Sequence, residues 1–359
     1  MLIATASGGG SDREGKITAA SVRLYDWPGD ARQPRLVAES TAAPAPSFLA
    51  YGRRTRTLFV ASETEAEGRV TAFALDGHRL MEGAQQGTDG NAAVHLALDQ
   101  RESWLAAANY RAGAIAGDAA IALFPIETGG SLGPLSGTLH HQGDGPDRGR
   151  QQGPHTHCVM FSPDNRLLAA IDLGTDGLWL YRFDEAIGVA RLAREVKLPS
   201  GSGPRHGVFH PSKPLVYICG ELDSTLMTLR YDSAASTAEL VDVDAATATS
   251  TSGRNYPSGV AISPDGHYLM LANRGADTIA VFWIDPETGM ARLRNEVLCG
   301  GAFPRAIRLD RAGGVLAVAN QKSGNIALFN RDFETGRIGA QPAASIELPS
   351  AMDAIFLDQ

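Results

Sequence analysis

The stretch SGVAISPDGHYLMLANRGADTIAVFWID, at residues 258–285, contains three short apolar runs separated by two polar turns. The first turn, SPDGH, combines proline, aspartate and glycine, the residues that chain reversals favour. The second and third runs are rich in branched and aromatic side chains and show no helical period. Such near-continuous apolar runs are typical of strands that are covered on both faces. The stretch therefore predicts three consecutive strands.

The same unit occurs along most of the chain. The residues that start its first turn follow one another at intervals of 47, 63, 48, 53, 47 and 48 residues. These markers are Gly52, Asp99, Ser162, His210, Ser263, Asp310 and Asp358. Repeats of about 40 to 50 residues made of short strands indicate a β-propeller, in which each repeat forms a four-stranded blade.

The two ends of the chain complement each other. DAIFLD at residues 353–358 matches the first strand of a repeat, and LIATAS at residues 2–7 aligns with the second. The sequence therefore predicts an all-β fold, a seven-bladed β-propeller whose last blade takes its innermost strand from the C-terminal segment. Its outer strands come from residues 1 to about 40. We expect residues 1–359 to form a single domain.

Composition narrows the function classes. The net charge is −8, and the lysines and arginines are scattered, so the sequence does not predict a nucleic-acid partner. No segment approaches the roughly 18 apolar residues of a membrane-spanning helix. The three cysteines, Cys158, Cys219 and Cys299, lie in or beside apolar runs and suggest buried thiols in a reducing compartment. We expect a cytoplasmic protein without membrane contact.

Aligned positions of the repeats point to a ligand site near the propeller axis. One column lies five residues before each marker: Ser47, Val94, His157, Arg205, Ser258, Arg305 and Asp353. The other follows the second strand: Ser7, Glu63, Tyr110, Leu173, Glu221, Arg274 and Gln321. Equivalent positions carry different chemistry in each blade, and the ends of strands are the usual place for binding residues.

Several of these segments resemble a known family. GPHTHCVMFSPDNRLLAAIDLGTDGLWLYRFD, SGPRHGVFHPSKPLVYICGELDSTL, SPDGHYLMLANRGADTIAVFWID and FPRAIRLDRAGGVLAVANQKSGNIALFN resemble the seven-bladed propeller lactonases. That family includes cycloisomerase-type 6-phosphogluconolactonases and fungal 3-carboxy-cis,cis-muconate lactonizing enzymes. The loop at residues 129–154 is similar to its long insertion. A departure is Gly220, where the family usually has asparagine.

The resemblance implies a function and a set of residues. It implies hydrolysis of an acidic sugar lactone such as 6-phosphogluconolactone, with lactonization by a carboxymuconate-type enzyme as the alternative. The implied catalytic residues are His157, Arg205, Glu221 and Arg274. Lactone opening needs a base, which Glu221 or His157 can supply, and a positive group for the oxyanion, which either arginine can supply. The expected substrate contacts are His155, Arg305, Glu63, Tyr110 and Ser258.

Other interpretations stay open for these residues. Arg205 and Glu221 could form a purely structural ion pair, His157 could be a core histidine, and the propeller could bind a small anion or a protein without catalysis. His155 and His157 could hold a metal with Glu221, but two nearby arginines disfavour a dication. We expect no metal and no cofactor, and a small anionic lactone or dicarboxylate as the partner. His206 is expected to point to the opposite face of its strand from Arg205 and to be a packing residue. His95 lies one residue off its column, although a bulge could bring it in.

Overall fold

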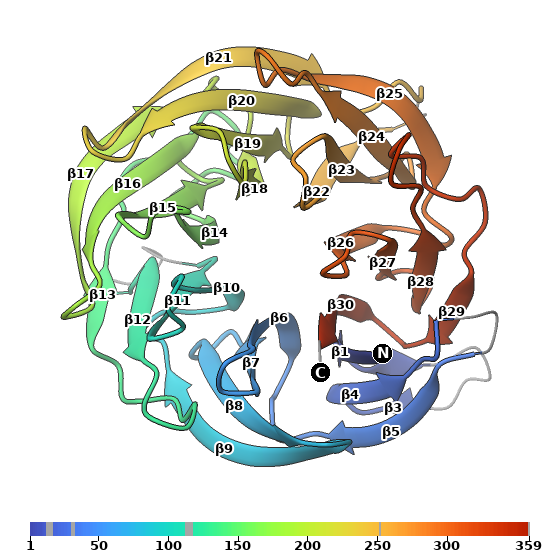
Figure 1. Ribbon diagram of the computed structural model, residues 1–359. Helices are drawn as coiled ribbons and strands as arrows, with labels where there is room; N and C mark the ends of the chain where they lie inside the picture. The colour runs from blue at the N-terminus through green and yellow to red at the C-terminus, as the bar shows by residue number, and fades with distance from the viewer. Residues whose placement is uncertain (12–16, 30–32, 112–117, 251–252, 358–359) are drawn as a thin grey trace.

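A computed structural model describes residues 1–11, 17–29, 33–111, 118–250 and 253–357 of the chain, and these form strands and no helix. Seven four-stranded antiparallel sheets stand in a ring, each with its first strand nearest the axis and its fourth outermost (Figure 1). A short hairpin, β2 (Gly10–Ser11) with β3 (Ile17–Thr18), adds a two-stranded sheet. The predicted seven-bladed propeller is confirmed.

Six blades are continuous in the chain and run from the axis outward. Blade one contains β6 (Pro46–Gly52), β7 (Thr57–Ser62), β8 (Arg69–Asp76) and β9 (Arg79–Gly87). Blade two contains β10 (Ala93–Leu98), β11 (Trp104–Asn109), β12 (Ile121–Pro125) and β13 (Gly137–Leu139). Blade three contains β14 (Thr156–Phe161), β15 (Leu167–Asp172), β16 (Gly177–Asp184) and β17 (Val189–Lys197).

The next three blades repeat this order. Blade four contains β18 (Pro204–Phe209), β19 (Leu215–Gly220), β20 (Thr225–Asp232) and β21 (Thr237–Ala245). Blade five contains β22 (Tyr256–Ile262), β23 (Tyr268–Arg274), β24 (Thr278–Ile284) and β25 (Ala291–Leu298). Blade six contains β26 (Pro304–Leu309), β27 (Val315–Asn320), β28 (Asn325–Asn330) and β29 (Ala344–Glu347).

The seventh blade joins the two ends of the chain, as predicted. Its order is β30 (Ala351–Leu357), β1 (Leu2–Ser7), β4 (Ser21–Asp26) and β5 (Arg35–Ser40). β1 pairs antiparallel with β30 over its whole length, from Leu2 opposite Leu357 to Ser7 opposite Ala351. This pairing ties the two ends of the chain together and completes the seventh blade.

The hydrophobic core lies between neighbouring blades. Buried side chains from facing sheets form seven clusters, one of which packs Tyr217 and Cys219 of blade four against Leu271 and Phe282 of blade five. Each second strand is therefore covered on both faces, which explains its continuous apolar sequence. All three cysteines are free and buried within these layers.

A β-bulge interrupts the innermost strand of every blade near its start. Such a bulge leaves residues unpaired and redirects their side chains. The residues left without a partner on the second strand are Ser47, Val94, His157, Arg205, His206, Ser258, Gly259, Arg305 and Met352. The first predicted column is therefore the line of bulges in six blades. In blade seven the bulged residue is Met352, because Asp353 pairs with Ala6.

The bulges correct one expectation about orientation. In β18 the bulge spans both Arg205 and His206, so strict alternation fails and His206 also faces the channel, where its ring lies 5.1 Å from that of His157. The bulge before His95 brings that ring in as well, 5.1 Å from His206. The expected packing role of His206 on the opposite face is therefore wrong.

Candidate active site

Three arginines converge on the carboxylate of Glu221, directly after β19. Arg274 Nη2 lies 2.6 Å and Arg205 Nε 3.0 Å from Oε2, while Arg150 Nη2 lies 2.5 Å from Oε1. The Glu221 and Arg205 side chains are only 4% and 2% exposed. Burial requires charges to be paired, yet one carboxylate here faces three guanidinium groups. The cluster therefore carries excess positive charge at one end of the channel.

Arg205 has donors that the protein does not use. Its Nε and Nη1 are buried and have no hydrogen-bond partner among the described residues, so the contact with Glu221 is an ion pair without hydrogen-bond geometry. Burial lowers the pKa of Arg205 to about 9, and the charge of Arg274 acts in the same direction. Arg205 is still a cation at neutral pH, and its unpaired buried donors mark a place where an anion would be stabilised.

The sequence comparison of repeats missed Arg150. It lies in the insertion at residues 129–154, outside the repeating unit, and its guanidinium also lies 3.5 Å from the Tyr110 hydroxyl. Gln151, which is fully buried, donates to Asp176 Oδ1 at 2.7 Å and to the carbonyl of Leu173. The interval of 63 residues and the likeness of this loop to the family's long insertion pointed to the segment, but neither selected Arg150, because no aligned blade has an equivalent position.

A second set of contacts anchors the same insertion to blade three. His141 Nδ1 lies 2.6 Å from Asp172 Oδ2, and both side chains are fully buried. Thr156 donates to the same carboxylate oxygen, and the His141 ring stacks on Trp179 at 4.2 Å. Asp172, the last residue of β15, thus fixes the loop that carries Arg150.

The aromatic side of the cluster comes from blades two and three. His155 Nδ1 lies 2.7 Å from the carbonyl of Tyr110, and the two rings stack with centroids 4.7 Å apart. His157 meets the same tyrosine edge-on at 5.4 Å, and its Nδ1 is buried without a hydrogen-bond partner in the described part of the chain. The three predicted residues therefore form one wall of the site, next to Arg150.

Two other predicted residues form a pair of their own. Arg305 Nη2 donates to Glu63 Oε2 at 2.7 Å, across 242 residues of sequence. Ser258, in contrast, is fully buried, and its hydroxyl donates to the carbonyl of Pro304 at 2.6 Å. The structure therefore does not place the Ser258 hydroxyl among the groups that a substrate could reach.

The electrostatics of the cluster set the protonation states. Burial raises the pKa of Glu221, but Arg274, Arg205 and Arg150 outweigh it and lower the pKa to about 2. Burial, together with the charges of Arg205 and Arg305, lowers the pKa of His157 well below its usual value. At neutral pH the site therefore contains a carboxylate, three guanidinium cations and a neutral imidazole.

The described residues contain no group of three or more histidine, cysteine, aspartate or glutamate side chains arranged to hold a metal ion. Within the same ranges, no helix is long and apolar enough to span a membrane. Histidines 155 and 157 are instead engaged with Tyr110.

Comparison with known proteins identifies the family of this chain. The family described as "Lactonase, 7-bladed beta-propeller" matches residues 13–356. The chain belongs to this family. The 6-phosphogluconolactonase of Bacillus subtilis (strain 168) is 29% identical over 286 residues, which cover 79% of each chain. That of Formosa agariphila is 28% identical over 301 residues, covering 81% of this chain and 82% of the relative.

A solved structure of the same lactonase class is similar throughout. The periplasmic gluconolactonase of Pseudomonas aeruginosa has a TM-score of 0.87 and 27% identity, covering 100% of this chain and 99% of that one. Two sugar-acid lactonases from different organisms are thus similar to the chain over most of its length.

Proposed function

We propose that the protein hydrolyses an acidic sugar lactone, with 6-phosphogluconolactone as the first choice. One observation carries the proposal: Arg205 has unused donors beside an arginine cluster in which Glu221 is the only carboxylate partner among the described residues. A phosphate or carboxylate would supply the missing negative charge by charge-assisted hydrogen bonds, for which arginine is especially suited. The names of the relatives from Bacillus subtilis and Formosa agariphila support the same substrate.

His157 is the proposed general base. Its neutral ring has an unpartnered buried Nδ1, so the ring is free to accept a proton from a water molecule that attacks the lactone carbonyl carbon. The carbonyl electrons move to oxygen, where Arg205 stabilises the negative charge. Collapse breaks the bond to the ring oxygen, which receives the proton, and the product is the open-chain acid.

Glu221 is proposed to position the arginines rather than to act as the base. A carboxylate with a pKa of about 2 is a weak base at neutral pH. Its two oxygens instead fix the guanidinium groups of Arg150, Arg205 and Arg274. An anionic substrate would offset the positive charge near His157 and bring its pKa closer to the working pH.

Two alternatives make different predictions. A carboxymuconate-type cycloisomerase would use the same arginines for a dicarboxylate and would protonate carbon. A non-catalytic propeller would bind anions without turnover. The sugar lactone is favoured because Tyr110 and His155 form a flat wall with polar edges, suited to a hydroxylated ring.

The test is direct. Hydrolysis of 6-phosphogluconolactone and of gluconolactone would be followed in a pH-stat after exhaustive chelation, since the proposed chemistry uses neither metal nor cofactor. We expect turnover that falls by about 100-fold or more in His157→Gln and Arg205→Met, both of which should stay folded. Stabilisation by sugar acids with no turnover of any lactone would favour the non-catalytic alternative.

We also propose a cytoplasmic location. The three free, buried cysteines are compatible with a reducing compartment. The related gluconolactonase of Pseudomonas aeruginosa is named periplasmic, so cell fractionation with antibody detection is needed to decide.

A further inference from the structure

The channel holds a cavity at the end opposite to Glu221. Its volume is about 510 Å³, and its walls include the last residues of three innermost strands, Leu98, Phe161 and Phe209. Gln100, which follows the first of these strands, lies at its rim. His157 and Arg205 lie near the starts of the same strands. The two sites therefore occupy opposite halves of the channel, and we call this one the lower chamber.

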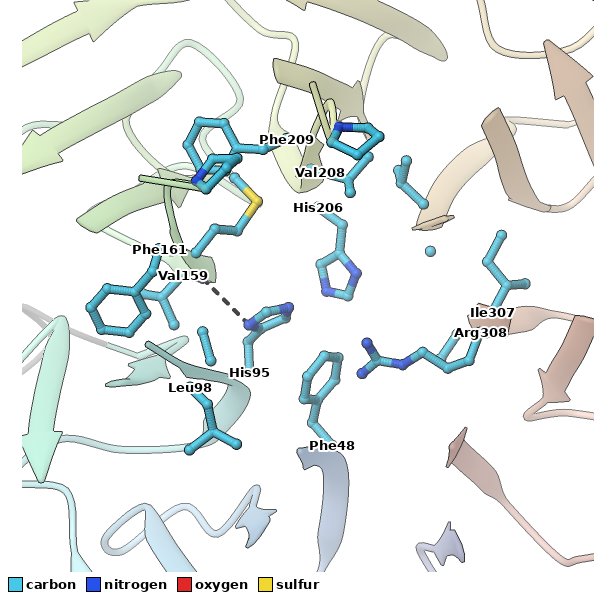
Figure 2. A pocket seen from close by; sticks show the side chains of 18 of the residues that line it. Phe48, His95, Leu98, Val159, Phe161, His206, Val208, Phe209, Ile307 and Arg308 are labelled. Carbon is cyan, nitrogen blue, oxygen red and sulfur yellow. Dashed lines mark hydrogen bonds between the residues drawn. The ribbon is translucent and has the colours of Figure 1, made fainter. Parts of the chain in front are cut away.

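The floor of the lower chamber is a set of rings from blades one, two and four. Phe48 and His95 lie 4.0 Å apart, and His206 lies 5.1 Å from His95 (Figure 2). Figure 2 shows these three rings and the Arg308 guanidinium directed toward the middle of the channel. The guanidinium carbon of Arg308 lies 4.2 Å from the centre of the Phe48 ring. This floor separates the lower chamber from the Glu221 cluster.

Two polar groups at the floor keep unused hydrogen-bonding capacity. His206 is 8% exposed, lines the chamber, and its Nε2 is buried without a partner in the described ranges. Arg308 donates from Nε and Nη2 to the Asp353 carboxylate, and also from Nη2 to the carbonyl of Leu49. Its Nη1 has no hydrogen-bond partner in the same described ranges. His95, in contrast, accepts from the amide of Val159 and contacts Cys158.

Polar and apolar atoms contribute similarly to the lining of the lower chamber, and the apolar part includes four branched side chains. Val159, Val208, Val260 and Ile307 line the chamber between the floor and the rim. A hydroxylated sugar would leave its hydroxyl groups unpaired against these walls, at a cost of roughly 1–3 kcal/mol for each buried group. An aromatic or cyclic hydrocarbon body would instead bury apolar surface there. These four side chains therefore favour a ligand with an apolar body beside its polar group.

The charges limit the ligand to a single negative group. One edge of Arg308 is neutralised by Asp353, whose buried carboxylate lies 2.9 Å from Nη2. Arg205, adjacent to His206 in the β18 bulge, adds positive charge behind the floor. One free guanidinium edge and one unpaired imidazole nitrogen match one carboxylate.

We propose that the lower chamber is a second binding site, for a small monocarboxylate with an aromatic or alicyclic body, which Arg308 and His206 hold by its carboxylate. The volume falls within the range of small-molecule sites. Because His206 lies between the chamber and His157, 5.1 Å from the latter, an occupant would contact a ring that touches the proposed active site. The assignment is independent of the proposed lactonase activity.

Isothermal titration calorimetry of the full chain with benzoate and with cyclohexanecarboxylate tests the site. We expect binding of one molecule per chain, with Kd between about 10 µM and about 1 mM for ligands of this size. Benzamide should bind about tenfold more weakly or worse, because it lacks the charge. No binding of either acid up to ~10 mM would overturn the proposal. Equal binding of benzamide would overturn the role of Arg308.

Two variants locate the bound acid. Val208→Phe fills the chamber from its wall, and Arg308→Lys keeps the charge beside Asp353 while removing the Nη1 donor. Both should weaken benzoate by at least about tenfold. Circular dichroism would detect misfolding of either variant. If one variant misfolds, the other still tests the site. Val243→Phe, at an exposed position of β21, is the matched control and should bind as wild type does.

A competition experiment separates the two halves of the channel. Benzoate binding should persist in the presence of saturating 6-phosphogluconate and in Arg274→Ala, which removes a member of the Glu221 cluster and none of the residues that line the lower chamber. Mutual exclusion of the two acids, or benzoate binding that survives Val208→Phe but is lost in Arg274→Ala, would place benzoate at the arginine cluster and contradict the second site.

Discussion

Arg150 Nη2 lies 2.5 Å from Glu221 Oε1, although the two residues are 71 positions apart and Arg150 comes from outside the repeats. Arg205 and Arg274 reach the other carboxylate oxygen from their own blades. One irregular loop thus completes a site that the regular ring alone would leave with two arginines. The loop is the part of the site that other sequences can change without altering the fold.

Removing Arg150 should reduce catalysis without unfolding the protein. Its side chain is 34% exposed, so Arg150→Ala leaves no large cavity, but Glu221 loses one of its charged partners. We expect kcat/KM for the lactone to fall by about 10- to 100-fold, the worth of one hydrogen bond to a charged group. Arg148→Ala is the control, because Arg148 lies in the same loop and its ion pair in the described part of the chain is with the exposed Asp144. Equal losses in both variants would contradict a specific role.

Glu221→Gln should make the protein depend on an added anion. The amide removes the charge that neutralises Arg150, Arg205 and Arg274, so their mutual repulsion is no longer balanced. We expect a lower Tm than wild type, and a larger upward shift in Tm when inorganic phosphate is added. Glu63→Gln, which affects Arg305 alone, should show a smaller phosphate effect. Thermal unfolding of the two variants with and without phosphate measures the difference.

Acid should destabilise the fold in two steps. Burial, with the charge of Arg205, lowers the pKa of His157 and of His206 well below the usual value. The unfolded chain binds protons near pH 6.5 that the folded state excludes, so the free energy of unfolding falls below that pH. Glu221, lowered to about 2, adds stability that is present above pH 4.5 and lost as the pH falls toward 2.

Denaturation by urea between pH 8 and pH 5 measures the first step. Each neutral buried histidine contributes a slope of up to about 1.4 kcal/mol per pH unit in this range. His206→Phe should reduce the slope by up to that amount, whereas His78→Gln, in an exposed turn, should not. A pH dependence that is unchanged in His206→Phe would show that this ring is protonated in the folded state.

Deleting residues 352–359 should unfold the ring. The deletion removes most of β30, the innermost strand of blade seven, and with it the Asp353 carboxylate that accepts from the amide of Leu49 at 3.0 Å. A circular permutant in which the two ends are joined keeps every strand pair and should retain a cooperative transition. Size-exclusion chromatography and thermal unfolding compare the truncated chain with the circular permutant. A truncated chain as stable as wild type would contradict the closure.

The repeats made most of the fold predictable. Apolar runs at a period near 48 residues predicted the blades. The match between residues 2–7 and the second strand of a repeat predicted that the two ends of the chain share the last blade. The alignment placed Glu221, Arg205 and Arg274 in the two columns near the axis, and the resemblance to the propeller lactonases then selected them as catalytic residues. Periodicity is a strong signal when each unit must bury both faces against its neighbours.

The sequence-based predictions of site residues fail where the chain departs from the regular repeat or strand geometry. Arg150 has no equivalent in other blades, so alignment gave no reason to select it. His206 was assigned by strict alternation, which the bulge at Arg205 and His206 breaks. Ser258 occupies the predicted column, but two backbone carbonyls take its hydroxyl. Whether a polar side chain faces a ligand or the backbone depends on local geometry that residue type alone does not encode.

The pairing of β1 with β30 also concerns how the protein is made. Ser7 donates to the carbonyl of Pro349 at 2.6 Å across 342 residues. During synthesis β1 leaves the ribosome long before β30. It therefore has no strand to pair with on that edge while the six other blades are synthesised. Its unpaired edge is a template for mispairing with other nascent chains during this interval. Binding of the amino-terminal strands by a chaperone would therefore matter most in the interval between the synthesis of β1 and the synthesis of β30.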